Sequence, residues 1–343
     1  MMQALTKIAP DRTELKKLPI PRYGARDVLV HVRSAALCGT DLHVYNWNSW
    51  AQGAGIHLPV VMGHECCGDV VAFGSEVKGI EAGDKVVAET HIPCGECYQC
   101  QNGEQHICHN LKMFSIHTDG CFAEYAVIPA ACARKIPREI PYDVGALMEP
   151  VGTALRAVAA AQVGGKSVVV VGCGPIGLFA VAAAAALGAA KIIATDSSAF
   201  RLAVAEKLNV DMALHSADKN NVQAVLGATG GYGADAVIEA SGSREGIKQS
   251  FQLLRKGGRV VLVGLPDNPV ELDLVKDVVF KEAKIIGIHG REMFKTWRQM
   301  ENLLVSGKLV VDPVITHILP LACWRDGFEL AKSGQACKVI YHP

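Results

Sequence analysis

The sequence has no excess of charge of either sign and no extended basic block. Its 343 residues include 34 Lys and Arg and 34 Asp and Glu, so the formal net charge at pH 7 is +0. Surfaces that bind nucleic acid or acidic membranes need concentrated positive charge. We therefore expect no nucleic-acid partner and no membrane partner.

Long apolar segments are also missing. The first residues, MMQALTKIAPDR, lack the apolar core of a secretory signal peptide. The longest apolar run, 176–190, is too short for a bilayer-spanning helix and follows a glycine-rich loop, as is typical of a buried helix. We expect a cytoplasmic protein.

Cysteine, by contrast, is plentiful. Four of the twelve cysteines lie in HIPCGECYQCQNGEQHIC with the spacing C-x2-C-x2-C-x7-C. Without a secretory signal, clustered cysteines indicate metal binding sooner than disulfides. Four thiolates can complete a tetrahedral structural zinc site, and an iron–sulfur cluster is the main alternative. The predicted ligands are Cys94, Cys97, Cys100 and Cys108, in a lobe over about 91–110.

The length predicts two domains, and the composition changes near residue 150. Residues 27–90 contain short β-branched runs between glycines and prolines, which indicates a barrel-like β unit, and no long helical pattern precedes about residue 140. From 151 onward, six apolar strands alternate with helical segments. The last helical segment between these strands is expected at 272–281. This alternation is typical of a doubly wound parallel sheet.

A glycine-rich loop lies between the first of these strands and its helix. Gly172 permits a tight turn, Gly174 lets the backbone approach a pyrophosphate, and Gly177 allows close helix–strand packing. Asp196, at the end of the next strand, would bind the adenosine ribose, so NAD is favoured over NADP. Arg201 could partly offset that preference. The further residues predicted to contact the cofactor are Ile176, Val263, Gly264, Leu265, Gly287 and Ile288.

A second metal site is suggested by three separate pieces of sequence. They are Cys38 in CGTDLH, His64-Glu65 in MGHECCG and Glu149 in LMEPVGTA. A catalytic zinc uses three ligands of mixed type and leaves one position open. Each of these segments alone is more often structural than functional. Their positions in the sequence are therefore not enough by themselves to identify a catalytic zinc site.

Over its full length the chain resembles the zinc-dependent medium-chain alcohol dehydrogenases. Four features together carry this resemblance: CGTDLH at 38, GHECCGDVVAFGSEVKGIEAGDKV from 63, the four-cysteine lobe and the glycine loop. The resemblance implies an α/β protein: a GroES-like β-barrel catalytic domain over 1–150, a doubly wound Rossmann NAD-binding domain over 151–297, and a return to the catalytic domain over 298–343. It also implies a homotetramer with two zinc ions per subunit, one catalytic and one structural.

The same resemblance implies roles for individual residues. Cys38, His64 and a carboxylate would hold the catalytic zinc. The expected carboxylate ligand is Glu65, with Glu149 as an acid near the zinc-bound water, and the alternative is that Glu149 is itself the third ligand. Zinc favours ionisation of a bound alcohol. Thr40 and His43 would pass the proton by way of the cofactor ribose to solvent.

A narrower resemblance is to the threonine-oxidising members of the family. It rests on CGTDLHVYNWNSW, GCFAEYAVIPA, MEPVGTA, GREMFKTW and KSGQACKVI. The small-molecule substrate implied is L-threonine, and Arg291 in GREMF is the candidate partner for its carboxylate, the alternative being a solvated arginine at a strand end. Tyr45, Trp47 and Trp50 would shape the substrate wall. The rival functions are a polyol or secondary-alcohol dehydrogenase, and a non-catalytic protein that binds zinc and dinucleotide.

Overall fold

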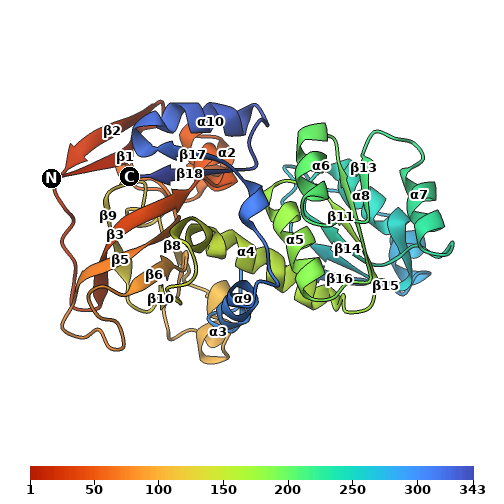
Figure 1. Cartoon of the computed structure of the whole chain (residues 1–343), viewed down its shortest axis with the longest axis horizontal. Coiled ribbons are helices and arrows are strands. Elements are labelled where there is room, and N and C mark those ends of the chain that lie inside the picture. Colours follow the sequence, from red (N-terminus) through yellow and green to blue (C-terminus); the bar gives the residue numbers. More distant parts are fainter. The chain divides into compact units, whose positions relative to one another are not determined.

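The computed structural model describes all residues, 1–343. The chain forms two compact units, one of Met1–Glu149 with Ile315–Pro343 and the other of Pro150–Val314 (Figure 1). The final segment joins the first unit from Ile315, later than the expected boundary at 298, because the turn Asp312–Val314 contacts helix α5 (Pro175–Ala186) of the second unit.

The first unit is built from β-sheets. A seven-stranded sheet has the order β10-β6-β5-β3-β18-β17, with β9 also paired to β3, and a three-stranded sheet has the order β2-β1-β4. Strands β7 and β8 form a separate pair. The strands are β1 Met2–Ala9, β2 Arg12–Leu18, β3 Asp27–Ala36, β4 Val60–Val61, β5 Glu65–Phe73, β6 Lys85–Ala88, β7 His91–Ile92, β8 Lys112–Met113, β9 Tyr125–Pro129, β10 Ala133–Lys135, β17 Ile315–Pro320 and β18 Lys338–His342.

Short helices join these strands. They are α1 Gly39–Asn46, α2 Ser49–Gly53, α3 Tyr98–Gln101 and α10 Trp324–Lys332, with 3₁₀ turns at Gln105–Ile107 and Leu321–Cys323. Helix α1 has no counterpart in the sequence-based prediction, because its eight residues are too few to give a helical periodicity. The C-terminal strand β18 pairs with β3 through Ile340 and Tyr341, so the end of the chain completes the sheet of this unit.

The second unit is a six-stranded parallel sheet of order β13-β12-β11-β14-β15-β16, which is the doubly wound order that the sequence predicts. Its strands are β11 Ser167–Val171, β12 Lys191–Asp196, β13 Met212–His215, β14 Ala234–Glu239, β15 Leu254–Leu262 and β16 Lys284–Gly287. Its helices are α5, α6 Ala199–Glu206, α7 Asn221–Ala228, α8 Arg244–Leu253 and α9 Lys295–Val305. The segment expected to be helical at 272–281 is a short π-helix, Leu274–Val279.

Helix α4, Tyr142–Ala161, connects the two units. It is long and apolar enough to cross a membrane, but 72% of its apolar window is buried in the protein. It therefore has the burial of a core helix.

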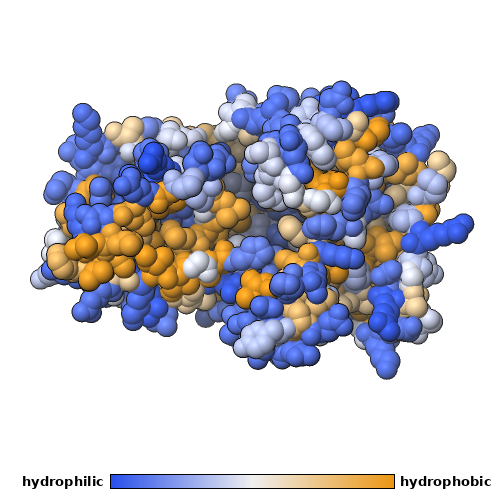
Figure 2. Space-filling view, turned by 180° about the vertical axis from the view of Figure 1, so that it is seen from behind, coloured by the Kyte–Doolittle hydropathy of each residue, from blue (hydrophilic) through white to orange (hydrophobic).

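Exposed apolar side chains of the second unit gather at one edge of its sheet. Ile285 on edge strand β16 is 42% exposed, and Phe280 after the π-helix is 71% exposed. Leu274, Val275 and Val279 are also exposed. Figure 2 shows an extended apolar area over this unit. An edge strand beside apolar surface is suited to pairing with another chain.

Candidate functional site

The four predicted cysteine ligands come together in the lobe that follows β7. Their sulfur atoms all lie within 4.8 Å of one another. Cys108 Sγ is 3.5 Å from Cys94 Sγ and 3.7 Å from Cys97 Sγ. Four sulfurs at about 2.3 Å from a tetrahedral zinc would be about 3.8 Å apart, so the lobe fits zinc.

Backbone amides in the lobe support thiolate charge. Cys97 precedes helix α3, and the backbone amide of Cys100 lowers the pKa of Cys97 to about 6. The amide of His109 also donates to Cys97 Sγ at 3.4 Å. A thiol that ionises near neutral pH is a ready metal ligand.

A second group of possible ligands contains Cys38, His64 and Glu65, whose donor atoms also lie within 4.8 Å of one another. Cys38 is the residue before helix α1, and Glu65 is the first residue of β5. The local structure of two distant segments therefore brings together a thiolate, an imidazole and a carboxylate, which is the donor set of an open zinc site.

Asp41 supports this group from helix α1. Its carboxylate accepts from the backbone amides of Cys38 at 2.9 Å and Gly63 at 3.2 Å, and Oδ1 lies 3.7 Å from His64 Nδ1. The buried Asp41 side chain thus holds the backbone of Cys38 close to the backbone that precedes His64. Asp41 was not identified from the sequence, although an aspartate three positions into a helix is typical of a capping box.

Lys338 on β18 forms a buried ion pair with Glu65 Oε2, and it also donates to the backbone oxygen of Leu37 at 2.9 Å. The other carboxylate oxygen, Glu65 Oε1, is buried and has no hydrogen-bond partner. An unpaired buried acceptor is costly, so it is a suitable ligand atom for a cation. Lys338 was not identified from the sequence, because it lies far from the other site residues along the chain.

The electrostatics of this group also favour a bound cation. Burial alone would lower the pKa of His64, but the negative charges of Asp41 and Cys38 outweigh it and raise the pKa to about 10. The surroundings therefore stabilise positive charge at this position. A divalent metal would satisfy the same need.

The remaining predicted residues of this site lie around the group. Thr40 Oγ1 is 3.8 Å from Cys38 Sγ. His43 is on the same helix and is exposed. Glu149, half-buried on α4, is not among the three clustered donors, but its charge acts on both His64 and Glu65.

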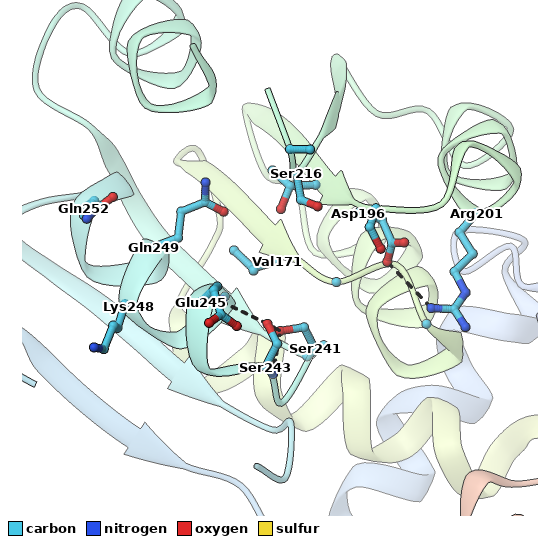
Figure 3. Close-up of a pocket in the computed structure, with 17 residues that line it drawn as sticks. Val171, Asp196, Arg201, Ser216, Ser241, Ser243, Glu245, Lys248, Gln249 and Gln252 are labelled. Atoms are coloured by element: carbon cyan, nitrogen blue, oxygen red, sulfur yellow. Dashed lines mark hydrogen bonds and ion pairs between the residues drawn. The ribbon is translucent and has the colours of Figure 1, made fainter. Parts of the chain in front are cut away.

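The second unit has a cavity of about 760 Å³ at the point where the strand order reverses between β11 and β14. This is where doubly wound sheets bind their ligands. Figure 3 shows Asp196 and Arg201 on one side of the cavity and α8, with Lys248, Gln249 and Gln252, on the other.

The glycine loop has the geometry that each glycine requires. Gly172 has φ +90°, and a Cβ there would lie 2.7 Å from the backbone of Ser241. A Cβ on Gly177 would lie 1.7 Å from the carbonyl oxygen of Gly172. Gly174, in contrast, faces open space at the start of α5, where backbone amides can meet a phosphate.

Asp196 closes the other side of the loop. Its carboxylate accepts from the backbone amides of Cys173 at 2.7 Å and Ser198 at 2.8 Å. Arg201 Nη1 is 3.9 Å from Asp196 Oδ2. The carboxylate is therefore held at the carboxyl end of β12, beside the cavity.

Other predicted cofactor residues lie outside this cavity. Val263, Gly264 and Leu265 follow β15, and the amides of the first two donate to the backbone oxygen of Glu239. Gly287 and Ile288 lie at the end of β16 and line a smaller cavity. Residues that line the large cavity and were not predicted include Ser216, Ser241, Ser243, Lys248, Gln249 and Gln252. They lack a motif, because they follow later strands at irregular spacing.

Arg291 is 1% exposed, so the alternative of a solvated arginine is wrong. Its guanidinium lies 5.5 Å from the Trp297 ring, and Nη1 is 3.4 Å from Thr153 Oγ1. The side chain is thus held in a defined position within the second unit.

Comparison with known proteins agrees with this geometry. Residues 24–138 match the alcohol dehydrogenase GroES-like domain, and residues 175–306 match the zinc-binding dehydrogenase domain. L-threonine 3-dehydrogenase from Bacillus velezensis is 45% identical over 331 residues, 96% of this chain and 95% of that protein. L-threonine 3-dehydrogenase from Pyrococcus furiosus is 41% identical over 342 residues, 99% of this chain and 98% of that protein.

Among solved structures, a zinc-binding dehydrogenase from Sinorhizobium meliloti with NADP bound superposes with a TM-score of 0.92 at 32% identity, covering 100% of this chain and 99% of that one. The predicted fold class, a GroES-like domain with a doubly wound parallel-sheet domain, is therefore confirmed.

Proposed function

The chain belongs to the family of zinc-binding alcohol dehydrogenases, and from that premise we propose that it oxidises the 3-hydroxyl of L-threonine to 2-amino-3-oxobutanoate, with NAD as hydride acceptor. The observation that carries the chemistry is the clustered thiolate, imidazole and carboxylate of Cys38, His64 and Glu65. The choice of substrate is supported by relatives 41–45% identical over nearly the whole chain that have this activity in their names.

Two zinc sites are proposed. Cys94, Cys97, Cys100 and Cys108 hold a structural ion, since four thiolates leave no open position. Cys38, His64 and Glu65 hold the catalytic ion, which when bound acts as a Lewis acid that makes an alcohol easier to ionise. The unpartnered Glu65 Oε1 supports this ligand set. Glu149 is assigned as the nearby acid that can exchange with Glu65.

The proton released from the substrate moves along helix α1. Thr40 and His43 are three residues apart, so their side chains lie on the same face of the helix. Thr40 Oγ1, beside the Cys38 sulfur, would accept the proton of the substrate hydroxyl while giving up its own hydroxyl proton toward His43. His43 is exposed and can release a proton to solvent.

NAD is assigned to the large cavity of the second unit. The amides at the start of α5 would bind its pyrophosphate, and Asp196 would accept from the ribose hydroxyls. A 2′-phosphate beside that carboxylate would be repelled, so NADP is disfavoured although Arg201 is close. The nicotinamide cofactor supplies the redox chemistry. Ile176, Val263, Gly264, Leu265, Gly287 and Ile288 remain predicted contacts.

Arg291 is the proposed partner of the substrate carboxylate. Its fixed guanidinium supports this assignment, because a bidentate arginine is the usual partner of a carboxylate. Arg291→Lys should raise the Michaelis constant for threonine more than it lowers kcat. An unchanged Michaelis constant in both this variant and Arg291→Ala would contradict the role.

The exposed apolar side chains around β16 support the proposal of a homotetramer, and a cytoplasmic location is proposed with it. Light scattering of the parent chain and of Phe280→Glu tests the proposed homotetramer. A parent that is monomeric would contradict the assembly.

The activity is tested by NAD and NADP reduction with L-threonine, D-threonine, sorbitol and 2,3-butanediol. L-Threonine with NAD should give the highest kcat/KM. A preference for sorbitol or butanediol would replace the proposed substrate by a polyol on the same site. No turnover of any alcohol, together with tight dinucleotide binding, would favour a non-catalytic protein.

A further inference from the structure

Asn48 makes two side-chain contacts between helices α1 and α2. Its Oδ1 accepts from the backbone amide of Ala51 at 3.1 Å and so caps the start of α2. Its Nδ2 lies 2.7 Å from His43 Nδ1. The amide therefore joins the start of α2 to the ring that we assign to proton release.

The cap fixes which end of the amide faces His43. A reversed amide would point its NH2 group at the donor amide of Ala51, so the orientation is set by the backbone. Asn48 Nδ2 is then a donor, and His43 Nδ1 must accept. In a neutral ring that accepts at Nδ1, the proton is on Nε2.

No charged side chain competes with Asn48 for this ring. Asp41 on α1 bonds the amides of Cys38 and Gly63 instead. The cations that face α1 from β1 and α10, Lys7 and Lys332, contact Tyr45. The Trp50 ring is 5.8 Å from the His43 ring. Among all residues described, Asn48 alone forms a hydrogen bond with the ring of His43.

We propose that Asn48 is a positioning residue that holds neutral His43 as its Nε2–H tautomer, and that His43 takes up a proton at Nδ1 only when Asn48 releases the ring. The protonated ring carries N–H on both nitrogens, so with Asn48 in place two donors would face each other. The charged form is therefore brief, which favours quick release of the proton. The inference rests on the relay role proposed for His43.

Two variants separate this role from helix capping. Aspartate and serine both cap helices as well as asparagine, so Asn48→Asp and Asn48→Ser keep α2. Aspartate offers His43 only acceptors and stabilises the charged ring, whereas serine is too short to keep the contact. Unchanged far-UV circular dichroism and melting temperature in both variants provide the structural control.

Nitrogen-15 NMR of histidine-labelled protein reads the tautomer directly, with His43→Gln used to assign the signal. The parent should show Nε2–H, Asn48→Asp should show Nδ1–H or the charged ring, and Asn48→Ser a mixture. The acid limb of kcat/KM against pH should move up by about one unit in Asn48→Asp and less in Asn48→Ser.

An Nδ1–H parent would overturn the proposal, as would an acid limb that stays in place in Asn48→Asp. The NMR result needs no turnover, so a protein that shows the Nε2–H tautomer but does not oxidise threonine would contradict only the proposed function. A threonine-oxidising protein with the other tautomer would contradict only the role of Asn48.

Discussion

Lys338 and Glu65 form an ion pair in which both side chains are almost fully buried, 2% and 0% exposed. Lys338 is on the last strand of the chain, and Glu65 belongs to the three-donor cluster. Breaking a buried pair by removing one partner is costly, because the other charge is left without compensation. The C-terminal strand is therefore coupled to the carboxylate of the donor cluster through this ion pair.

Lys338→Met should lower the free energy of unfolding by about 3–5 kcal/mol in zinc-free protein, and by less in zinc-loaded protein. The reason for the difference is that a metal ligated by Glu65 would compensate the carboxylate that has lost its lysine. Urea unfolding of both forms measures it. Lys332→Met is the matched control, since its exposed pair with Glu329 should be worth about 1 kcal/mol or less. Equal losses in both metal states would contradict ligation by Glu65.

The glycine loop yields a pair of substitutions with opposite outcomes. Gly174→Ala should fold normally, because nothing lies within 4 Å of the added Cβ and the backbone is extended there. The methyl group would occupy the space assigned to the pyrophosphate, so the Kd for NAD should rise by roughly tenfold or more. Calorimetry of NAD binding, with the melting temperature measured alongside, tests this.

Gly177→Ala should instead lower the stability of the domain. Alanine improves helix propensity by only about 1 kcal/mol, whereas the new Cβ would lie 1.7 Å from a backbone oxygen that cannot move aside. The melting temperature should fall clearly below that of Gly174→Ala. Equal melting temperatures would show that the loop is looser than the structure has it.

The sequence predicted the parts of the site that are local and periodic. The cysteine spacing and the glycine loop each fall within a short segment, the alternation of strands is a periodic pattern, and the structure has all three. It did not predict Lys338, which reaches Glu65 only because β18 pairs with β3. Asp41 was missed for a related reason: its partners include Gly63, on a distant segment. Contacts that depend on tertiary pairing leave no pattern in a single sequence.

The four-cysteine lobe should lose its metal when one ligand is removed. Cys100→Ser should reduce the zinc content from two ions to about one per chain and open the segment 101–107 to proteases, because the lobe has few other buried side chains. Elemental analysis and limited proteolysis measure both effects. Cys323→Ser, at a half-buried cysteine outside the cluster, should keep two ions. Iron in place of zinc in the parent would favour the iron–sulfur alternative.

Asp235 makes the stability of the second unit depend on pH. It accepts from Ser167 N at 2.9 Å, Ser167 Oγ at 2.7 Å and Arg255 Nε at 2.7 Å, and so joins the starts of β11, β14 and β15. Burial alone would raise the pKa of Asp235, but these bonds outweigh it and hold the pKa below its ordinary value. A carboxylate of this kind stabilises the fold above the unfolded pKa of about 3.9, and the stabilisation is lost as the pH falls below that value through the lower pKa of the folded state.

Asp235→Asn removes the ionisable group but keeps an acceptor. The parent should have the higher urea midpoint at pH 7, and the gap between the two proteins should shrink as the pH is lowered from about 5 to about 3. Asp267→Asn is the control, because Asp267 is exposed and makes no side-chain hydrogen bond or ion pair in the structure described over 1–343. The difference in urea midpoint between the parent and this variant should stay near zero at every pH. A gap for Asp235→Asn that is independent of pH would mean that the carboxylate contributes through its shape and not through its charge.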